Sequence, residues 1–175
     1  MKIDSGLAET LLKNSQYLAS DSLAHAYEHS LEVELPFLQY YKSHFEIVPI
    51  AFMSSDVAAL KKVGEEIAAV LQDPARKGSV MLVASSDMTH YEAQEAAQKK
   101  DKEAIDAILA LDPDRLAERI RRHNISMCGF APAIVMLQAA KRMGATGARL
   151  VKYQTSGDVT GDTSSVVGYA GILVY

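Results

Sequence analysis

The feature that most constrains the fold is a nearly unbroken apolar run at residues 79–84, which ends in a dense group of polar side chains. A continuous apolar run of this length predicts a β-strand that is covered on both faces. The full stretch from Val80 to Tyr91 reads V-M-L-V-A-S-S-D-M-T-H-Y, so hydroxyls, a carboxylate and an imidazole follow the run. In open α/β sheets ligands bind beyond the carboxyl ends of the strands. The stretch therefore predicts a buried strand with a site at its end.

Strand patterns alternate with helix patterns along the rest of the chain. Apolar periodicity, Asx caps and proline positions predict helices at residues 5–17, 28–41, 56–71, 92–109, 128–143 and from 112 onward. Besides the run at 79–84, the sequence predicts three further strands, at residues 45–52, 149–155 and 166–175. Pro36 predicts a kink or a restart in the second helix, and Pro49 predicts an irregular or edge strand. We expect one α/β domain over residues 1–175, a three-layer sandwich with a mixed sheet covered by helices on both faces.

Composition excludes several classes of protein. The chain has 175 residues and a formal net charge of −4, which argues against a general affinity for nucleic acid. Cys128 is the single cysteine, so no internal disulfide can form, as is usual in a reducing compartment. No stretch approaches the roughly 18 apolar residues that cross a bilayer, and the amino terminus lacks a signal-peptide pattern. We expect a cytoplasmic protein that contacts neither membranes nor nucleic acid.

Asp87 and His90 are the first candidate functional residues. They are three apart directly after the predicted strand, and in a helical turn this spacing brings both side chains to one side. The carboxylate could then orient the imidazole, or both groups could face a ligand. Equally, Ser86 and its neighbours could cap the following helix, with His90 on its surface. The residues alone leave both interpretations open.

Two further polar clusters carry the same ambiguity. Glu28, His29 and Glu32 have a helical spacing that can present metal ligands, and such a set is also ordinary on an exposed helix. The loop between the last two predicted strands contains Asp158 and Asp162 among hydroxyls and glycines. A polar loop of this kind can line a site, but its aspartates could equally be turn residues.

Cys128 lies in S-M-C-G-F-A-P, where a helix is predicted to begin. Unpaired backbone N–H groups at a helix amino terminus stabilise a thiolate. The thiol could therefore be a metal ligand or a nucleophile. Free cysteines also often pack as small apolar residues.

These pieces occur in an order that resembles one family. E-H-S-L-E-V-E-L-P-F-L-Q, S-S-D-M-T-H-Y, C-G-F-A-P-A-I and Y-x-T-S-G-D followed by S-S-V-V-G-Y-A-G resemble the Memo-like family, also called AmmeMemoRadiSam system protein B. The resemblance runs from about Leu7 to Tyr175. It implies a fold related to class III extradiol dioxygenases, which are non-haem iron enzymes. It also implies that Cys128 is a metal ligand and that Asp87 and His90 flank the pocket, with His90 as an acid–base group. The remaining motif residues are then expected to line the pocket: Glu28, His29, Ser86 and Asp158.

The chain departs from the family pattern in one respect. The amino-terminal half of the pattern is absent, together with the two histidines that join the cysteine as ligands. His25 and His29 do not replace them, because His29 belongs to the E-H-S motif, which full-length members have in addition. We therefore expect a fragment, a chain completed by another chain or by self-association, or a misassigned start. Unpaired strand edges and exposed apolar faces should result.

The resemblance and the residues together predict a pocket for a redox metal. A cysteine with histidines and an open position suits iron(II) or copper, with His90 moving a proton and Asp87 orienting it. The site should be incomplete in this chain, and its ligand a small molecule or a peptide. One alternative is a non-catalytic peptide- or protein-binding module. Another is a Cys128–His90–Asp87 hydrolase, in which His90 activates the thiol.

Overall fold

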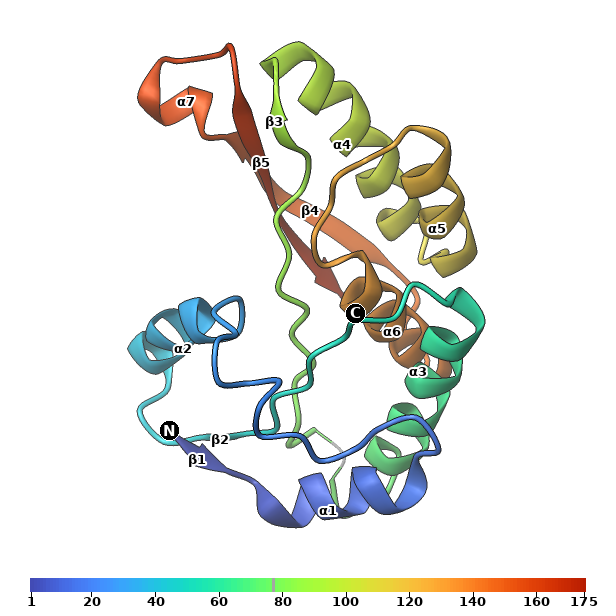
Figure 1. The fold of residues 1–175 in the computed structure, drawn as a ribbon. Coiled ribbons are helices and arrows are strands. Elements are labelled where there is room, and N and C mark those ends of the chain that lie inside the picture. The colour runs from blue at the N-terminus through green and yellow to red at the C-terminus, as the bar shows by residue number, and fades with distance from the viewer. Residues whose placement is uncertain (77) are drawn as a thin grey trace.

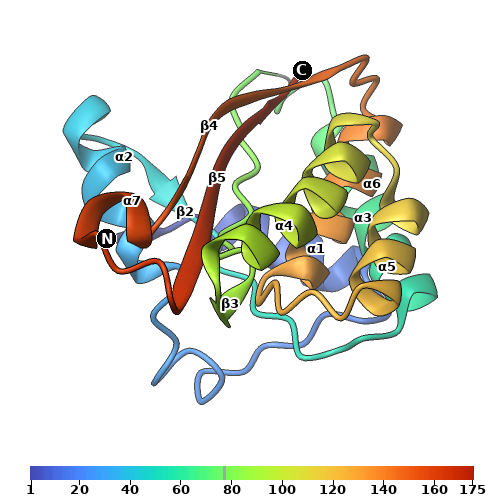
Figure 2. The same ribbon diagram turned by 90° about the horizontal axis from the view of Figure 1, so that it is seen from above.

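Helices gather on one side of a long β-hairpin in this protein. The structure is a computed structural model, and it describes residues 1–76 and 78–175. Seen from above, α3 to α6 lie on one side of the ribbon formed by β4 and β5, and α2 and α7 lie on the other (Figure 2). The predicted α/β class is confirmed, and the described strands form two small sheets rather than one.

The larger described sheet contains the strand on which His90 lies. Its order is β3 (His90–Glu92), β5 (Val166–Val174) and β4 (Ala148–Thr155), and both pairings are antiparallel. β5 therefore lies in the middle of this sheet. The smaller sheet pairs β1 (Lys2–Ile3) in parallel with β2 (Glu46–Ile47), and it lies between the helices at residues 5–14 and 35–41 (Figure 1).

Helix starts follow from short polar side chains and prolines. Asp56 caps its helix by accepting the N–H groups of Ala58 and Ala59, and Pro36 falls in a first turn, where its missing N–H costs nothing. The helical elements are α1 (Ser5–Asn14), the 3₁₀ turn η1 (Glu32–Glu34), α2 (Leu35–Tyr41), α3 (Val57–Leu71), α4 (Gln94–Leu109), α5 (Pro113–Arg122), α6 (Phe130–Arg142) and α7 (Gly157–Thr160). The helix predicted at residues 28–41 is thus wrong in its first part, because residues 32–34 form a 3₁₀ turn and α2 begins only at Leu35, with Pro36 in its first turn. Within the described residues, none of these helices is long and apolar enough to cross a membrane.

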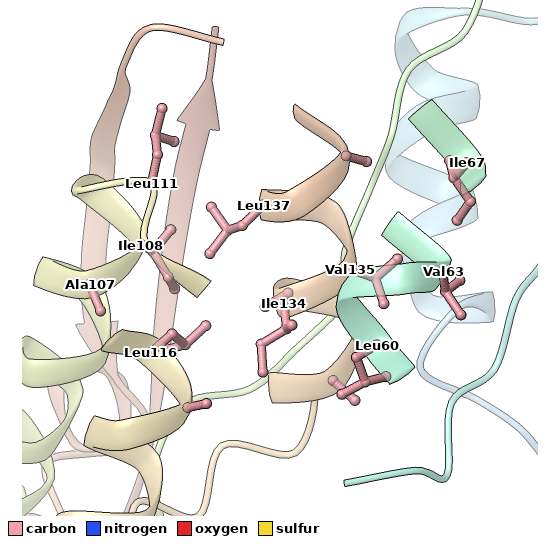
Figure 3. Close-up of a cluster of buried hydrophobic side chains, with 14 of the residues drawn as sticks. Leu60, Val63, Ile67, Ala107, Ile108, Leu111, Leu116, Ile134, Val135 and Leu137 are labelled. Carbon is pink, nitrogen blue, oxygen red and sulfur yellow. The ribbon is translucent and has the colours of Figure 1, made fainter. Parts of the chain in front are cut away.

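The core lies among α3, α4, α5 and α6. Their facing side chains interlock in Figure 3: Leu60, Val63, Ile67, Ala107, Ile108, Leu111, Leu116, Ile134, Val135 and Leu137. Burying each of the larger aliphatic chains contributes about 1.5–3 kcal/mol. Gly64 lets α3 approach α6 closely, since a Cβ there would lie 2.7 Å from the carbonyl oxygen of Val135. This helical core is the support against which the site segments pack.

Two predicted strands are wrong in detail. Residues 79–84 form an extended segment with no strand pairing, and of the strand predicted at 45–52 only Glu46–Ile47 is paired. Val80 and Leu82 pack toward the core, whereas Met81 is 69% exposed and Val83 is 48% exposed. The run is therefore covered on one face in the described structure. The reason is that an apolar sequence makes an extended chain favourable, but a strand also needs a neighbour that supplies hydrogen bonds.

Candidate functional site

The segment that follows the extended run presents Asp87 and His90 by burying the two residues between them. Met88 and Thr89 are 2% and 0% exposed. The N–H of Met88 donates to the Gly168 carbonyl over 2.9 Å, and the N–H of Gly168 donates to the Thr89 carbonyl over 2.9 Å. Because the buried pair is fastened to β5 in this way, the flanking carboxylate and imidazole are left at the surface of the core.

In the segment that contains Cys128, buried residues likewise hold the chain and leave the polar side chains exposed. Ile125 and Met127 are buried, and Ser126 and Cys128, which alternate with them, are exposed. Helix α6 begins at Phe130, so the predicted helix start at Cys128 is two residues early. The thiol therefore precedes the helix and is not held by the amides of its first turn.

The structure brings these two segments together. One ligand atom from each of Asp87, His90 and Cys128 lies within 4.8 Å of the others. The Nε2 atom of His90 is 3.5 Å from Oδ2 of Asp87, and the backbone N–H of Asp87 donates to Sγ of Cys128 over 3.2 Å. The imidazole is mostly covered, with 21% of its side chain exposed, whereas 46% of the Asp87 side chain is exposed. We call these three residues the Cys–His–Asp cluster.

Ser126 fixes the orientation of His90, and sequence reasoning missed it. Its hydroxyl accepts the backbone N–H of His90 over 2.8 Å, and its carbonyl oxygen lies 2.8 Å from Nδ1. A carbonyl oxygen can only accept, so Nδ1 carries the proton in this contact. In the neutral ring Nε2 then has a lone pair and faces the Asp87 carboxylate. The only available signal was the place of Ser126 within the S-M-C motif.

This geometry bears on the hydrolase alternative. In a cysteine–histidine–aspartate relay the carboxylate orients the ring from the nitrogen opposite the nucleophile. Here that nitrogen, Nδ1, is bonded to the Ser126 carbonyl, and Asp87 lies at Nε2 instead. The arrangement does not favour Asp87 as the orienting member of a relay.

Close backbone contact between Gly129 and the serines before Asp87 sets the spacing of the cluster. The N–H of Gly129 donates to Oγ of Ser86 over 2.9 Å, and that hydroxyl is 4.0 Å from Sγ of Cys128. A Cβ on Gly129 would lie 2.3 Å from the Ser85 carbonyl oxygen and 2.4 Å from Cβ of Ser86. Glycine is therefore required here, and Ser86, predicted to line the pocket, lies beside the thiol.

The E-H-S loop touches the site segment but does not place its histidine in the cluster. Oγ of Ser85 donates to the Ser30 carbonyl over 2.8 Å. His29 is exposed and pairs with Glu32, with Nδ1 3.0 Å from Oε2. Burial raises the pKa of Glu28, but hydrogen bonds from the Ser30 hydroxyl and nearby backbone amides outweigh it and leave that pKa below its usual value. Glu28 thus acts on its own loop in this structure.

Asp158 holds the turn at the far end of β4. Its Oδ2 accepts the N–H of Thr155 over 2.7 Å and the Thr155 hydroxyl over 3.1 Å. These bonds fit the turn-residue alternative of the sequence analysis. A pocket-lining role for Asp158 stays a prediction.

A buried carboxylate behind the cluster was not predicted. Asp101, on α4, is fully buried and accepts the backbone N–H of Thr89 at 2.8 Å and the hydroxyl of Tyr153 at 2.7 Å. Burial, and then the hydrogen bond to Asp101, raise the pKa of Tyr153. Gly168 makes room for this carboxylate, since a Cβ there would lie 1.9 Å from Oδ2 of Asp101. The polar run around Asp101 is typical of a solvated helix face, so no sequence pattern predicts this contact.

Comparisons with known proteins agree with the resemblance described above. The model of the family described as "Memo-like protein" matches residues 1–173. A MEMO1 family protein of Methanopyrus kandleri is 45% identical over 174 residues, 99% of this chain and 61% of that protein. MEMO1 family proteins of Methanocaldococcus jannaschii and Methanosarcina mazei are 44% and 42% identical, over 99% and 98% of this chain and 61% and 63% of their own lengths. The chain thus spans about three fifths of the length of these curated relatives.

Proposed function

This chain belongs to the Memo-like family, and we propose that its Cys–His–Asp cluster is part of a binding site for a redox metal, iron(II) or copper. The observation that supports this proposal most directly is the contact between Nε2 of His90 and Oδ2 of Asp87. Both atoms carry lone pairs when Nδ1 donates to Ser126, so their 3.5 Å approach is stabilised only by a cation or a proton between them. A thiolate donor suits copper and iron.

Each residue has a separate task in this proposal. Cys128 is the metal ligand, and the Asp87 N–H stabilises the negative charge of its sulfur. Nε2 of His90 accepts and returns a proton at the bound ligand, while the Ser126 carbonyl holds the ring in the required tautomer. The Asp87 carboxylate stabilises the imidazolium that forms. When bound, the metal would supply redox chemistry and a positive charge that attracts an oxygen-bearing ligand.

One metal ligand on an exposed surface makes an incomplete site. Cys128 is exposed, and Asp87 is half-exposed, so solvent reaches the cluster freely. Tight binding of a transition metal usually takes more than one protein ligand. We infer that further donors come from outside the described residues, either from a complementing chain or through self-association, and that the ligand is a small molecule or a peptide. For this chain alone we expect weak binding.

Anaerobic titration tests the proposal. We would titrate iron(II), and separately copper(I), into the reduced chain, measure the affinity by calorimetry, and record the charge-transfer absorption of the thiolate, which only a sulfur ligand produces. We expect saturable binding near one equivalent, with affinity reduced at least about tenfold in Cys128→Ser, which removes a soft ligand. His29→Ala is the matched control, because His29 is exposed and paired with Glu32 outside the cluster. Equal affinity of the wild-type and Cys128→Ser chains would refute the proposal.

The same variants separate the two alternative functions. A peptide-binding module would retain its ligand after Cys128→Ser and would show no metal-dependent absorption. A hydrolase would show rapid carbamidomethylation of Cys128 by iodoacetamide at pH 6, and a further His90→Ala substitution would slow it. The longer Methanopyrus kandleri relative, titrated in parallel, would show whether additional chain strengthens metal binding.

A further inference from the structure

Tyr91, directly after His90, has a backbone conformation that tyrosine rarely adopts. Its φ is +58°, in the left-handed region that is costly for bulky side chains. Two other non-glycine residues in the described ranges have positive φ, and each has a ready explanation. Asn124 belongs to the residue types that tolerate this region. Leu111 is 8% exposed, so its burial in the core offsets the strain. Tyr91 has neither explanation, because its side chain is 79% exposed.

A β-bulge creates this conformation. His90 pairs with Val167 and Glu92 pairs with Val166, so two residues of β5 face three residues of β3, and Tyr91 is the extra one. In such bulges the left-handed position usually belongs to glycine. A glycine would satisfy the fold here without strain.

The residues on both sides of Tyr91 are held firmly, which keeps the strain in place. The backbone N–H of His90 is bound by the Ser126 hydroxyl, as described above. After the bulge, Oε1 of Glu92 accepts a bond from Lys100 over 2.6 Å, and Lys100 also binds the Asn124 carbonyl over 3.2 Å. Strain that surrounding structure maintains in this way is typical of functional sites.

The ring of Tyr91 lies beside the cluster. Its centroid is 5.7 Å from that of the His90 ring, at an interplanar angle of 58°. A second exposed tyrosine, Tyr169 on β5, lies close enough that, after burial, Asp87 and Tyr91 contribute to raising its pKa. The Tyr91 ring therefore lies beside His90, and it offers an apolar face and a polar edge.

We propose that Tyr91 is a ligand-contacting residue of the Cys–His–Asp cluster, and that its ring receives the flat ring of a ligand that also carries an anionic oxygen. This inference rests on the proposed function, because a metal at the cluster would attract the anionic oxygen while the Tyr91 ring contacts the aromatic part. The bulge then orients the aromatic side chain of Tyr91 toward the site. The strain it carries is kept because the ring binds the ligand.

Benzoate is a suitable probe, and cyclohexanecarboxylate is its matched control, with the same carboxylate and number of carbons but no aromatic face. We would measure the binding of both to the iron(II)-loaded chain by anaerobic calorimetry. The wild-type chain and Tyr91→Phe should bind benzoate more tightly than the control. In Tyr91→Ala the affinity for benzoate should fall about 3- to 10-fold, the range expected for one aromatic contact, with little change for cyclohexanecarboxylate. Asn124→Gly, at another exposed left-handed position, should behave as wild type.

Urea unfolding shows whether Tyr91 serves the fold instead. If its ring binds only ligand, Tyr91→Ala should unfold at the wild-type urea concentration, and Tyr91→Gly should unfold at a higher concentration than Tyr91→Ala, because glycine relieves the strain. Unchanged benzoate affinity in Tyr91→Ala, or no preference for benzoate in the wild type, would overturn the inference.

The iron titration separates the two proposals. If iron binds normally and benzoate does not bind, this inference fails and the proposed function stands. If iron does not bind, the proposed function fails. The same benzoate comparison on the metal-free chain then decides the inference.

Discussion

Replacement of Asp101 by alanine should destabilise the protein severely, because this carboxylate supports the site segment from behind. Its side chain is fully buried, and its two oxygens accept the backbone N–H of Thr89 and the hydroxyl of Tyr153. A hydrogen bond to a charged acceptor contributes about 1.5–3 kcal/mol, and a buried N–H left without a partner costs about 1–3 kcal/mol. We expect Asp101→Ala to lower the free energy of unfolding by about 3–5 kcal/mol, allowing for overlap between these effects.

Two milder variants separate the contributions of the two hydrogen bonds to the loss predicted for Asp101→Ala. Asp101→Asn keeps the volume and an acceptor for Thr89, so it should cost about 1–2 kcal/mol. Tyr153→Phe removes one of the two bonds and should cost about 1.5–3 kcal/mol. In the Asp101→Ala background Tyr153→Phe should cost much less, since its partner is already gone.

Urea unfolding followed by far-ultraviolet circular dichroism measures these differences, because the chain has no tryptophan for fluorescence. Asp106→Ala is the matched control on the same helix. Asp106 pairs with Lys102 at 2.5 Å, but 40% of its side chain is exposed, so its loss should change stability by about 0.5 kcal/mol or less. The reasoning is refuted if Asp101→Ala lies within about 1 kcal/mol of wild type, or if Tyr153→Phe costs the same in both backgrounds.

Three further predictions concern other contacts. Gly129→Ala should cost about 1–3 kcal/mol, because its Cβ would lie 2.4 Å from that of Ser86; urea unfolding would measure this loss, and wild-type stability would contradict it. Hydrogen bonds from Arg142, and then from Lys62, lower the pKa of Glu65 from 4.5 to about 2. The resulting stabilisation is present above pH 4.5 and disappears as the pH falls toward 2, so Glu65→Gln should lose less stability than wild type across that window in acid unfolding followed by circular dichroism. Asp56→Ala, which removes a cap that accepts two N–H groups, should lower the free energy of unfolding by about 1 kcal/mol; no change in the urea midpoint would show that the cap contributes nothing.

Helices with strong local signals could be predicted from the sequence. Asp56, Asp112 and Pro36 specify where helices begin through groups within a few residues of one another, and the structure places helix starts at or next to each of them. Strand pairing could not be predicted in the same way. Residues 79–84 have a strand-like composition, but whether they pair depends on a partner elsewhere in the chain, which composition does not reveal.

The candidate site could likewise be predicted only in part. The approach of Cys128 to the Asp87–His90 segment was expected from the resemblance, and the structure brings the three side chains together. The residues that support them were not expected. Ser126 acts largely through its carbonyl, and Asp101 looks like one of several charged residues on a polar helix. Such contacts depend on backbone position and on packing across the fold, neither of which leaves a periodic pattern.

The bond between His90 and the Ser126 carbonyl also affects how the site can change by mutation. Any of the usual substitutions at residue 126 removes or alters a side chain and leaves the main-chain oxygen in place. The neighbours of residue 126, Ile125 and Met127, are each 5% exposed and keep that oxygen where it is. Substitutions at residue 126 should therefore remove the hydroxyl that accepts the His90 N–H but leave the bond to the ring intact. Damaging changes should instead cluster at the two apolar neighbours, where a poorly fitting side chain would move the peptide and release the imidazole.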